Sequence, residues 1–377
     1  MRPPLCLTLN DRRRGVPSRY AAEDMKGFIL AGGTGSRLRP ITHTQSKQLI
    51  PVANQPILFY GLRAMADAGI ENVGIIVGDT EEEIRGAVGD GGRFGVRVTY
   101  IRQEAPLGLA HALLTGRDYL DDDDFVMYLG DNLLPEGVSR FVDSYREHGP
   151  DAQIFLVKVP EPERFGVAVL DGDRVVELVE KPKEHISDLA LAGIYIFTPT
   201  VFEAAAAIEP SWRGELEITD AIQYLVDHGY RVRAETISGW WKDTGKLEDL
   251  LEANRIMLDA HTGEVRGRVD EASHLVGEVL VEEGAEVVES VIRGPSAIGP
   301  DVRVTRSALG PYVSIARGSQ IEDSEIEDSI VMEGCRIADV RRISSSLVGE
   351  RVTVRKGEDR PAAYRLMLGD SSDVRIP

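Results

Sequence analysis

Uninterrupted apolar runs alternate with amphipathic segments up to about residue 250. The runs at 26–31 (KGFILA), 72–78 (NVGIIVG) and 124–129 (DFVMYL) lack the polar residue at every second position that a half-exposed strand shows. Such runs are typical of parallel strands whose two faces are both covered. Residues 56–70 (PILFYGLRAMADAGI) instead have apolar side chains at helical spacing. The alternation predicts a doubly wound α/β sheet.

A hairpin interrupts this alternation near the middle of the chain. Residues 165–182 predict two strands joined by the Asp-Gly turn at 171–172, a dipeptide that favours tight hairpins. With a further strand expected at 189–197, we interpret the segment as an insertion that covers one side of a pocket. The remaining expected elements are a strand at 96–101 and helices at 80–88, 108–119, 215–228 and 246–260.

A different period governs the chain after about residue 262, where helical patterns end. Glycine, proline and serine separate aliphatic residues that recur every six positions, with one slip of a single position. A six-residue period with small turn residues predicts a parallel β-helix. A sandwich of short strands is the alternative, because the register decays beyond residue 330. The recurring residues are Ile292, Ile298, Val304, Leu309, Ile315 and Ile321.

Composition and charge narrow the classes of partner. The 377 residues carry 62 acidic and 43 basic side chains, and the formal net charge is −19. A chain this acidic is not expected to bind nucleic acid or anionic membranes in general, but a local basic pocket for a phosphorylated small molecule is compatible with it. Apolar residues make up 42%, enough for a sizeable core. No apolar run approaches the roughly 18 residues of a membrane span.

Cysteine usage and the N-terminus bear on the compartment. Cys6 and Cys335 are the only cysteines, so neither a disulfide framework nor a cysteine metal site is expected, and a reducing cytoplasm suits the chain. Residues 1–24 have an apolar patch before their arginines, the reverse of a secretory signal. We expect this segment to be a disordered extension or the product of a start codon assigned too early. The expected folded domains are 25–261 and 262–377.

The loop that follows the first strand, FILAGGTGSRLRP at 28–40, has the composition of a phosphate-binding loop. It matches neither the Gly-Lys-Ser/Thr ending of a P-loop nor the dinucleotide fingerprint. Three glycines allow backbone N–H groups to approach an anion closely, and Arg37 adds a permanently charged fork for phosphate oxygens. A tight strand-to-helix turn without ligand is the alternative. The glycines are Gly32, Gly33 and Gly35.

Two carboxylates are candidates for a metal site. Asp131 and Asn132 follow the buried strand at 124–129, at the sheet edge where ligands gather in open parallel sheets. Hard oxygen ligands there suit Mg²⁺, which proteins hold through one or two carboxylates plus substrate phosphates. Asp243 in GWWKDTG is a second candidate. The alternatives are an ordinary turn at Gly-Asp-Asn and a helix N-cap at Asp243 or Thr244.

Cations and one further carboxylate suit a sugar phosphate. Glu180 and Lys181 end the second hairpin strand, and Arg213 lies in a polar loop before a helix. Lys47 stands in a polar stretch before an apolar one; each of these side chains alone is also compatible with an ordinary surface. The chain has no Gly-x-Ser-x-Gly, His-Glu-x-x-His or Cys/His cluster. Phosphoryl and nucleotidyl transfer tolerate that absence, because the attacking oxygen is already an anion.

As a set, these segments resemble the sugar-nucleotidyltransferase family in its long form. The motifs occur in family order over residues 26–260, and the C-terminal repeats extend the match; residues 1–24 fall outside it. The resemblance implies a Rossmann-like mixed sheet followed by a left-handed β-helix. The motifs are LAGGTGSRLRP, SKQLIPVANQPILFYGL, IRQEAPLGLAHA, YLGDN, FGVAVLD, EKP, GELEITD and WWKDTG.

The resemblance also implies a reaction, in which glucose 1-phosphate attacks the α-phosphorus of dTTP and yields dTDP-glucose and pyrophosphate for deoxysugar synthesis. Asp131 and Asp243 are expected to hold Mg²⁺, Arg37 to grip the leaving phosphates, and Lys47 to neutralise charge near the α-phosphorus. Gln103, with the backbone at Gly108, is expected to read the base. The other residues expected at the nucleotide are Leu30, Gly32, Gly33, Gly35 and Gln48, and those expected at the sugar phosphate are Asn132, Gly166, Glu180, Lys181, Gly193 and Arg213.

Three alternatives stay open at this level. UTP is one, because a carboxamide such as Gln103 pairs with the imide edge that thymine and uracil share. A non-catalytic sensor of nucleotide sugars is the second. An acyltransferase activity of the β-helix is the third, although His261 and His274 both precede the clearest repeats. A homo-oligomer is expected.

Overall fold

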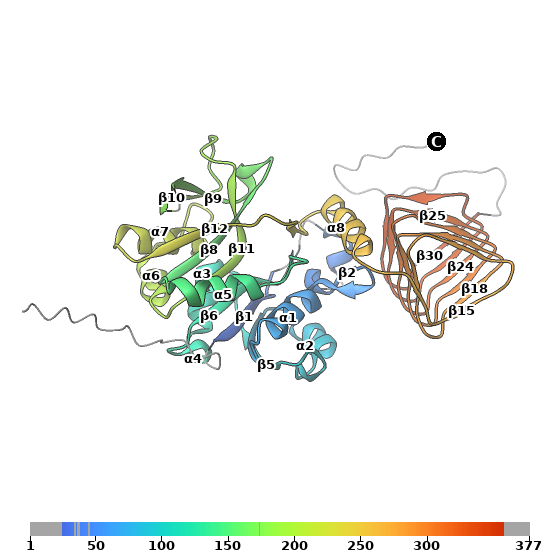
Figure 1. Ribbon diagram of the computed structural model, residues 1–377, viewed down its shortest axis with the longest axis horizontal. Coiled ribbons are helices and arrows are strands. Elements are labelled where there is room, and N and C mark those ends of the chain that lie inside the picture. The colour runs from blue at the N-terminus through green and yellow to red at the C-terminus, as the bar shows by residue number, and fades with distance from the viewer. Residues whose placement is uncertain (1–24, 34, 36–37, 44–45, 173, 358–377) are drawn as a thin grey trace, which may run out of the picture. The chain divides into compact units, whose positions relative to one another are not determined.

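The computed structural model describes residues 25–357 except 34, 36–37, 44–45 and 173, and it divides into two compact units (Figure 1). We call them the sheet unit and the coil unit. The sheet unit contains the first strand, residues 42–49 and residues 57–243. The coil unit contains residues 50–56 and the chain from Thr244 onward. Within the described part of the chain, no helix has both the length and the apolar character needed to span a bilayer.

The sheet unit is built on one mixed sheet. Nine described strands form it in the order β5-β4-β1-β6-β11-β8-β12-β10-β9. Its first four strands are parallel, as the uninterrupted apolar runs predicted, whereas β11 runs antiparallel to both of its neighbours. The strands are β1 (Lys26–Leu30), β4 (Asn72–Val77), β5 (Arg97–Arg102), β6 (Phe125–Leu129), β8 (Ala152–Lys158), β9 (Gly166–Asp171), β10 (Arg174–Glu180), β11 (Leu189–Phe197) and β12 (Val232–Thr236).

Helices cover both faces of this sheet, which confirms the doubly wound class. Successive residues of β1 point to opposite faces, so Phe28 and Leu30 belong to one core and Ile29 to the other. The helices on the Ile29 side are α1 (Ile57–Asp67), α2 (Glu81–Val88) and α5 (Ser139–His148). Those on the Phe28 side are α3 (Leu109–Thr115), α4 (Arg117–Leu120), α6 (Val201–Ala207) and α7 (Ile218–Asp227). Short 3-10 turns are η2 (Ile41–His43), η3 (Lys47–Leu49), η4 (Gly92–Phe94) and η5 (Pro162–Arg164).

The structure differs from the sequence expectation in several elements. The helix expected at 108–119 is divided at Gly116, where any Cβ would overlap the ring of Phe28. Among the longer elements of the sheet unit, α5, α6, β8 and β12 were not predicted. The predicted hairpin exists as β9 and β10, and it forms one edge of the main sheet.

The coil unit confirms the expected β-helix and excludes the sandwich. Its strands pair in parallel with strands one turn later and form three separate sheets, the arrangement expected of a left-handed β-helix. The first sheet holds β14 (Glu264–Val265), β17 (Val279–Val281), β20 (Ser296–Ile298), β23 (Val313–Ile315), β26 (Ser329–Val331) and β29 (Leu347–Val348). The second holds β15 (Arg268–Val269), β18 (Glu286–Val288), β21 (Arg303–Thr305), β24 (Gln320–Glu322), β27 (Arg336–Ala338) and β30 (Thr353–Arg355). The third holds β16 (His274–Val276), β19 (Val291–Arg293), β22 (Ala308–Leu309), β25 (Glu325–Glu327) and β28 (Ile343–Ser344).

The six aliphatic residues of the predicted repeat are all buried inside the coils. The expectation that the register decays beyond residue 330 was wrong. Ile315 pairs with Val331, and the stack continues through β30. Paired residues in successive coils are 16 or 17 positions apart, as in Ile298 with Ile315 and Ile315 with Val331, so the six-residue period slips while the inward-pointing residues stay in register.

Columns of serines stabilise one corner of the coils. The hydroxyl oxygen of Ser273 accepts the N–H of Ser290, that of Ser290 accepts Ser307, and that of Ser307 accepts Ser324. The column ends at Val340, whose N–H donates to Ser324 at 3.1 Å. Each serine therefore satisfies a backbone donor that the corner would otherwise leave buried without an acceptor.

The helix α8 (Leu247–Asp259) and a hairpin of β2 (Pro51–Val52) and β3 (Gln55–Pro56) belong to the coil unit. Buried Asn254 on α8 connects them: its Oδ1 accepts Ala53 N–H at 2.9 Å and the Ser314 hydroxyl at 2.6 Å. The N-cap of α8 is Lys246, whose N–H donates to Asp249, so the N-cap alternative for Asp243 and Thr244 was wrong.

Candidate active site

A buried lysine joins two carboxylates at the carboxyl edge of the sheet. Lys47 lies in η3, and its side chain is 7% exposed. Its Nζ lies 2.5 Å from Asp131 Oδ2 and 3.5 Å from Asp243 Oδ1. Burial removes most of the water that would solvate this ammonium group. The negative charges of the two carboxylates offset that loss.

Strand pairing sets the positions of the two aspartates. Asp131 follows β6, the parallel strand between β1 and β11, at its carboxyl end. The short strands β7 (Asn132–Leu133) and β13 (Lys242–Asp243) then pair antiparallel, which places Asp243 opposite Asn132. This contact between distant parts of the chain brings the second carboxylate next to the first.

The glycine loop begins at the same edge. Leu30 ends β1, its carbonyl accepts the N–H of Gly130, and Ala31 donates to Ile76 O. The loop therefore starts between the ends of three neighbouring strands. A Cβ on Gly32 would lie 3.4 Å from Gln103 Oε1, and one on Gly33 would lie 3.7 Å from the Gln48 amide.

Position 35 can accommodate only glycine without strain. Its φ is +59°, and a Cβ there would lie 2.9 Å from Cβ of Lys47. The hydroxyl of Thr42 donates to Gly35 O at 2.7 Å and holds the loop beside the lysine. Arg37, which the sequence placed at the leaving phosphates, lies outside the described residues.

Two glutamines lie beside the loop. Gln103, just after β5, is buried, and its Nε2 lies 2.9 Å from His111 Nδ1 and 3.5 Å from the carbonyl of Gly108. Gly108 is the N-cap of α3. Gln48 is also buried, and its Oε1 accepts the Ser46 hydroxyl at 2.8 Å. Both side chains are therefore held in one orientation by neighbours.

Asn132 is oriented by the bulge in β11. Its Nδ2 donates to Ala192 O at 2.5 Å, and the same carbonyl accepts Trp241 Nε1 at 2.8 Å. Gly193 has φ of +71°, and any Cβ there would overlap the Asn132 amide. Burial raises the pKa of Tyr128, and its protonated hydroxyl donates to Asn132 O at 3.0 Å.

A second polar cluster surrounds Glu180 at the end of β10. Thr219 donates its hydroxyl to Glu180 Oε2 at 2.6 Å, and a Cβ on Gly166 would lie 2.5 Å from that hydroxyl. Lys181 Nζ lies 3.3 Å and Arg213 Nη1 lies 3.4 Å from Glu180 Oε1. Glu180 thus holds two cations near each other, and cations of this kind bind phosphate oxygens.

Burial also raises the pKa values of two acidic side chains near this cluster. The pKa of Glu217 is raised by burial and by the charge of Glu180, although the Ser211 hydroxyl and Arg213 act against that rise. Burial, followed by the charge of Glu180, also raises the pKa of Asp220. Arg213 Nη2 contacts Glu215 at 2.7 Å, so this guanidinium faces several carboxylates.

The donor set at Lys47 suits a divalent cation that the substrate helps to hold. The described residues contain no group of three or more His, Cys, Asp or Glu side chains able to hold a metal by themselves. Asp131 and Asp243, however, lie within ion-pair distance of one ammonium. Mg²⁺ usually takes one or two carboxylates and completes its shell with water and phosphate oxygens, so the pair fits it.

The structure therefore brings together most of the residues that the sequence singled out, in two groups. Lys47, Asp131 and Asp243 form the first with the glycine loop, and Glu180, Lys181 and Arg213 form the second. Sequence reasoning missed three supporting residues, although each lies within a motif that it used. They are His111 in LAHA, Thr219 in GELEITD and Trp241 in WWKDTG.

Comparison with known proteins finds one matching family and several similar proteins. Residues 26–260 match the family described as "Nucleotidyl transferase". A glucose-1-phosphate thymidylyltransferase of Streptomyces griseus is 56% identical over 353 residues, 93% of this chain and 99% of that protein. One of Streptomyces antibioticus is 52% identical over 354 residues, with the same coverage.

A solved structure resembles about two thirds of the chain. It is a Bacillus anthracis protein provisionally assigned as a glucose-1-phosphate thymidylyltransferase, crystallised with sucrose. The TM-score is 0.60 at 37% identity, over 64% of this chain and 98% of the other.

Proposed function

Because the chain belongs to the nucleotidyl transferase family, we propose that it joins dTTP and glucose 1-phosphate into dTDP-glucose and pyrophosphate. Curated proteins with that name are 52% and 56% identical to it over 93% of its length, and the chain is a transferase. The observation that carries the proposal is the position of Lys47 between Asp131 and Asp243 at the carboxyl edge of the sheet.

In the proposed reaction, an oxygen of the sugar phosphate attacks the α-phosphorus of dTTP in line with the departing oxygen. The new P–O bond forms as the bond between the α-phosphorus and pyrophosphate breaks. The attacking oxygen carries no proton at neutral pH, so the site needs no general base. Catalysis then rests on alignment and on charge stabilisation.

The proposed nucleotide site is the first group of residues. Lys47 faces the α-phosphate and stabilises charge that grows there in the transition state. The backbone of the glycine loop, with Arg37, receives the β- and γ-phosphates. Gln103 offers its carboxamide to the imide edge of the base, and its contact with His111 fixes the direction in which it points. Leu30, Gln48 and Gly108 line the same site.

Asp131 and Asp243 are the residues that would hold Mg²⁺. When bound, the ion neutralises phosphate charge and stabilises the leaving group. The two carboxylates also keep Lys47 in place. Removal of either one is therefore expected to disturb the metal site and the lysine together.

The proposed sugar-phosphate site is the second group with the β11 bulge. Lys181 and Arg213 bind the phosphate, and Glu180 accepts from sugar hydroxyls while it positions both cations. Asn132 borders the sugar, held by the Ala192 carbonyl. Gly166 and Gly193 leave room for the ring because side chains there would overlap Thr219 and Asn132.

A pyrophosphate-release assay tests the proposal. The purified protein is supplied with Mg²⁺ and with each pair of dTTP, UTP, GTP or ATP and several sugar 1-phosphates. We expect the highest kcat/KM with dTTP and glucose 1-phosphate. Faster turnover with UTP would make the enzyme a uridylyltransferase, since Gln103 alone does not separate the two bases. Release from no pair would favour the sensor function.

We also propose how the rest of the chain is used. Residues 25–261 carry the reaction, and residues 262–377 serve packing or assembly into a homo-oligomer. A cytoplasmic location agrees with the free, buried Cys335 and with nucleotide substrates. Acetyl-CoA turnover by the full-length enzyme would contradict the structural use of the β-helix.

A further inference from the structure

A cavity of about 550 Å³ lies at the other edge of the main sheet. Arg233 and its neighbour Val232 line it at the amino end of β12. Because β12 is parallel to β8, and β8 and β6 both run antiparallel to β11, β12 has the same direction as β6. Asp131 follows the carboxyl end of β6, so the cavity and the candidate active site are at opposite edges.

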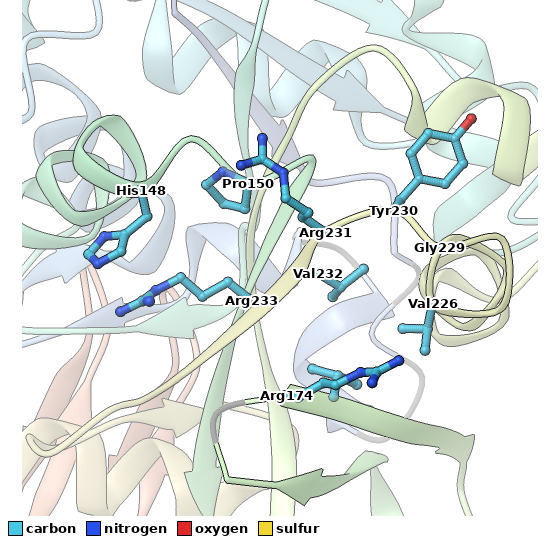
Figure 2. Close-up of a pocket in the computed structure, with 10 residues that line it drawn as sticks. His148, Pro150, Arg174, Val226, Gly229, Tyr230, Arg231, Val232 and Arg233 are labelled. Atoms are coloured by element: carbon cyan, nitrogen blue, oxygen red, sulfur yellow. The ribbon is translucent and has the colours of Figure 1, made fainter. Parts of the chain in front are cut away.

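The lining combines cations with an apolar wall (Figure 2). Three arginines and His148 contribute the polar side, and Val226 and Val232 contribute the apolar side. The volume is that of a small-molecule site, where apolar walls surround a few polar groups. Such a gathering of positive charge is unexpected on a chain whose net charge is −19. The arginines are Arg174, Arg231 and Arg233.

Two of the arginines oppose each other. Arg174 on β10 and Arg233 on β12 are cross-strand partners, a position where like charges destabilise a sheet. Figure 2 shows their guanidinium groups turned apart, that of Arg233 toward His148. The Nε of Arg233 is buried and has no hydrogen-bond partner among the described residues.

Within the described part of the chain, neighbouring protein groups form hydrogen bonds or ion pairs with the side chain of only one of these three arginines. Arg231 already donates to Gly149 O and lies 3.9 Å from Asp151, so it caps α5. Asp171 is the partner of Arg174 on β9, but the described residues show no ion pair between them. Among the described residues, neither Arg174 nor Arg233 therefore has an acidic partner within ion-pair distance.

We propose that this cavity binds a phosphate monoester with a small apolar body, at a site separate from the substrates. The phosphate binds the guanidinium group of Arg233, whose fork matches its oxygens, and the positive charge of Arg174 on the neighbouring strand strengthens this binding. The apolar body rests on Val226 and Val232.

Calorimetric titration with phenyl phosphate tests the site. The proteins are the wild type, the double variant Arg174→Gln/Arg233→Gln, and Arg213→Gln in the candidate active site. We expect tighter binding of phenyl phosphate than of inorganic phosphate to the wild type. The double variant is expected to lose this binding by about tenfold or more, equivalent to about 1.4 kcal/mol. Arg213→Gln is expected to retain it.

Several results would overturn the proposal. They are unchanged affinity in the double variant, loss confined to Arg213→Gln, and equal affinity for phenyl phosphate and inorganic phosphate. Asp171→Asn tests the effect in the opposite direction. Removal of the acid opposite Arg174 should raise the affinity for phenyl phosphate, and a lower affinity would count against the site. Arg174 is exposed, so the single variant Arg174→Gln keeps the test valid if the double variant fails to fold.

Discussion

Lys47 and Asp131 are 84 positions apart in the chain, yet Lys47 Nζ lies 2.5 Å from Asp131 Oδ2. The lysine comes from a short turn after the glycine loop, and the aspartate follows the carboxyl end of β6. Their contact defines the place where a nucleotide phosphate meets both a cation and a metal ligand.

Lys47→Ala is expected to lower kcat by roughly 10²–10³-fold, the range for loss of one preorganised electrostatic group. The ammonium acts on charge that develops at the α-phosphorus, so KM for the nucleotide should change less. Steady-state kinetics with the best substrate pair measure both constants. Lys158→Ala, at an exposed position of β8, is the control. An effect confined to KM would assign Lys47 to ground-state binding.

Asp131→Asn keeps the shape of the side chain and removes its charge. We expect a loss of roughly 10²–10⁴-fold in kcat, because a metal ligand contributes several kcal/mol to the stabilisation of transition-state charge. Nucleotide affinity, measured by calorimetry, should fall less than the rate. Asp143→Asn on the exposed side of α5 serves as the matched change. Near-normal turnover of Asp131→Asn would refute the assignment of the metal.

Glu180→Gln should raise KM for glucose 1-phosphate by about tenfold, the effect of roughly 1.4 kcal/mol of lost binding. The neutral amide no longer holds Lys181 and Arg213 by charge, and both are assigned to the phosphate. KM for the nucleotide should stay the same. Glu177→Gln changes an exposed residue of the same strand and should leave both constants unaltered. Equal increases in the two KM values would show a general disturbance of the fold.

Ser307→Ala is expected to destabilise the coil unit by about 1–3 kcal/mol, the cost of one buried backbone donor without an acceptor. The Ser307 hydroxyl oxygen accepts the N–H of Ser324 at 3.1 Å. Urea unfolding followed by circular dichroism measures the change. Ser346 is a suitable control, since its hydroxyl accepts no backbone N–H among the described residues and Ser346→Ala should cost less.

Asp328 gives the coil unit a dependence on acid pH. Burial acts to raise its pKa, but hydrogen bonds from Arg255 and Ser345 outweigh burial, so the pKa lies below the usual 3.8. A carboxyl with a lowered pKa contributes stability above its unfolded pKa, and that contribution is lost as pH falls through the folded value. Arg255 is 44% exposed, so the contribution is about 1 kcal/mol or less.

Asp328→Asn should therefore be less stable than the wild type at pH 7, and the difference should shrink between pH 5 and pH 3. Urea unfolding at several pH values measures it. A difference that is constant over this range would show that packing, and not ionisation, is responsible.

Local sequence patterns were sufficient to predict that the chain contains an α/β sheet and a β-helix. The apolar runs in β1, β4 and β6 predicted a sheet buried on both faces, because a parallel strand must cover both faces with apolar side chains. The repeat of Ile292, Ile298 and their successors predicted the coils, because each turn of a β-helix places similar residues inward. The same logic placed Asp131 at the carboxyl edge.

Tertiary structure alone decided which residues meet. No local pattern indicates that β13 pairs with β7 and brings Asp243 next to Asn132, since two-residue strands have no signature of their own. The opposition of Arg174 and Arg233 likewise depends on the register of β10 against β12, and β12 was not predicted. The sequence determined the elements and the kinds of chemistry they carry; long-range pairing determined the site, because the partners of a backbone edge are chosen by packing over the whole sheet.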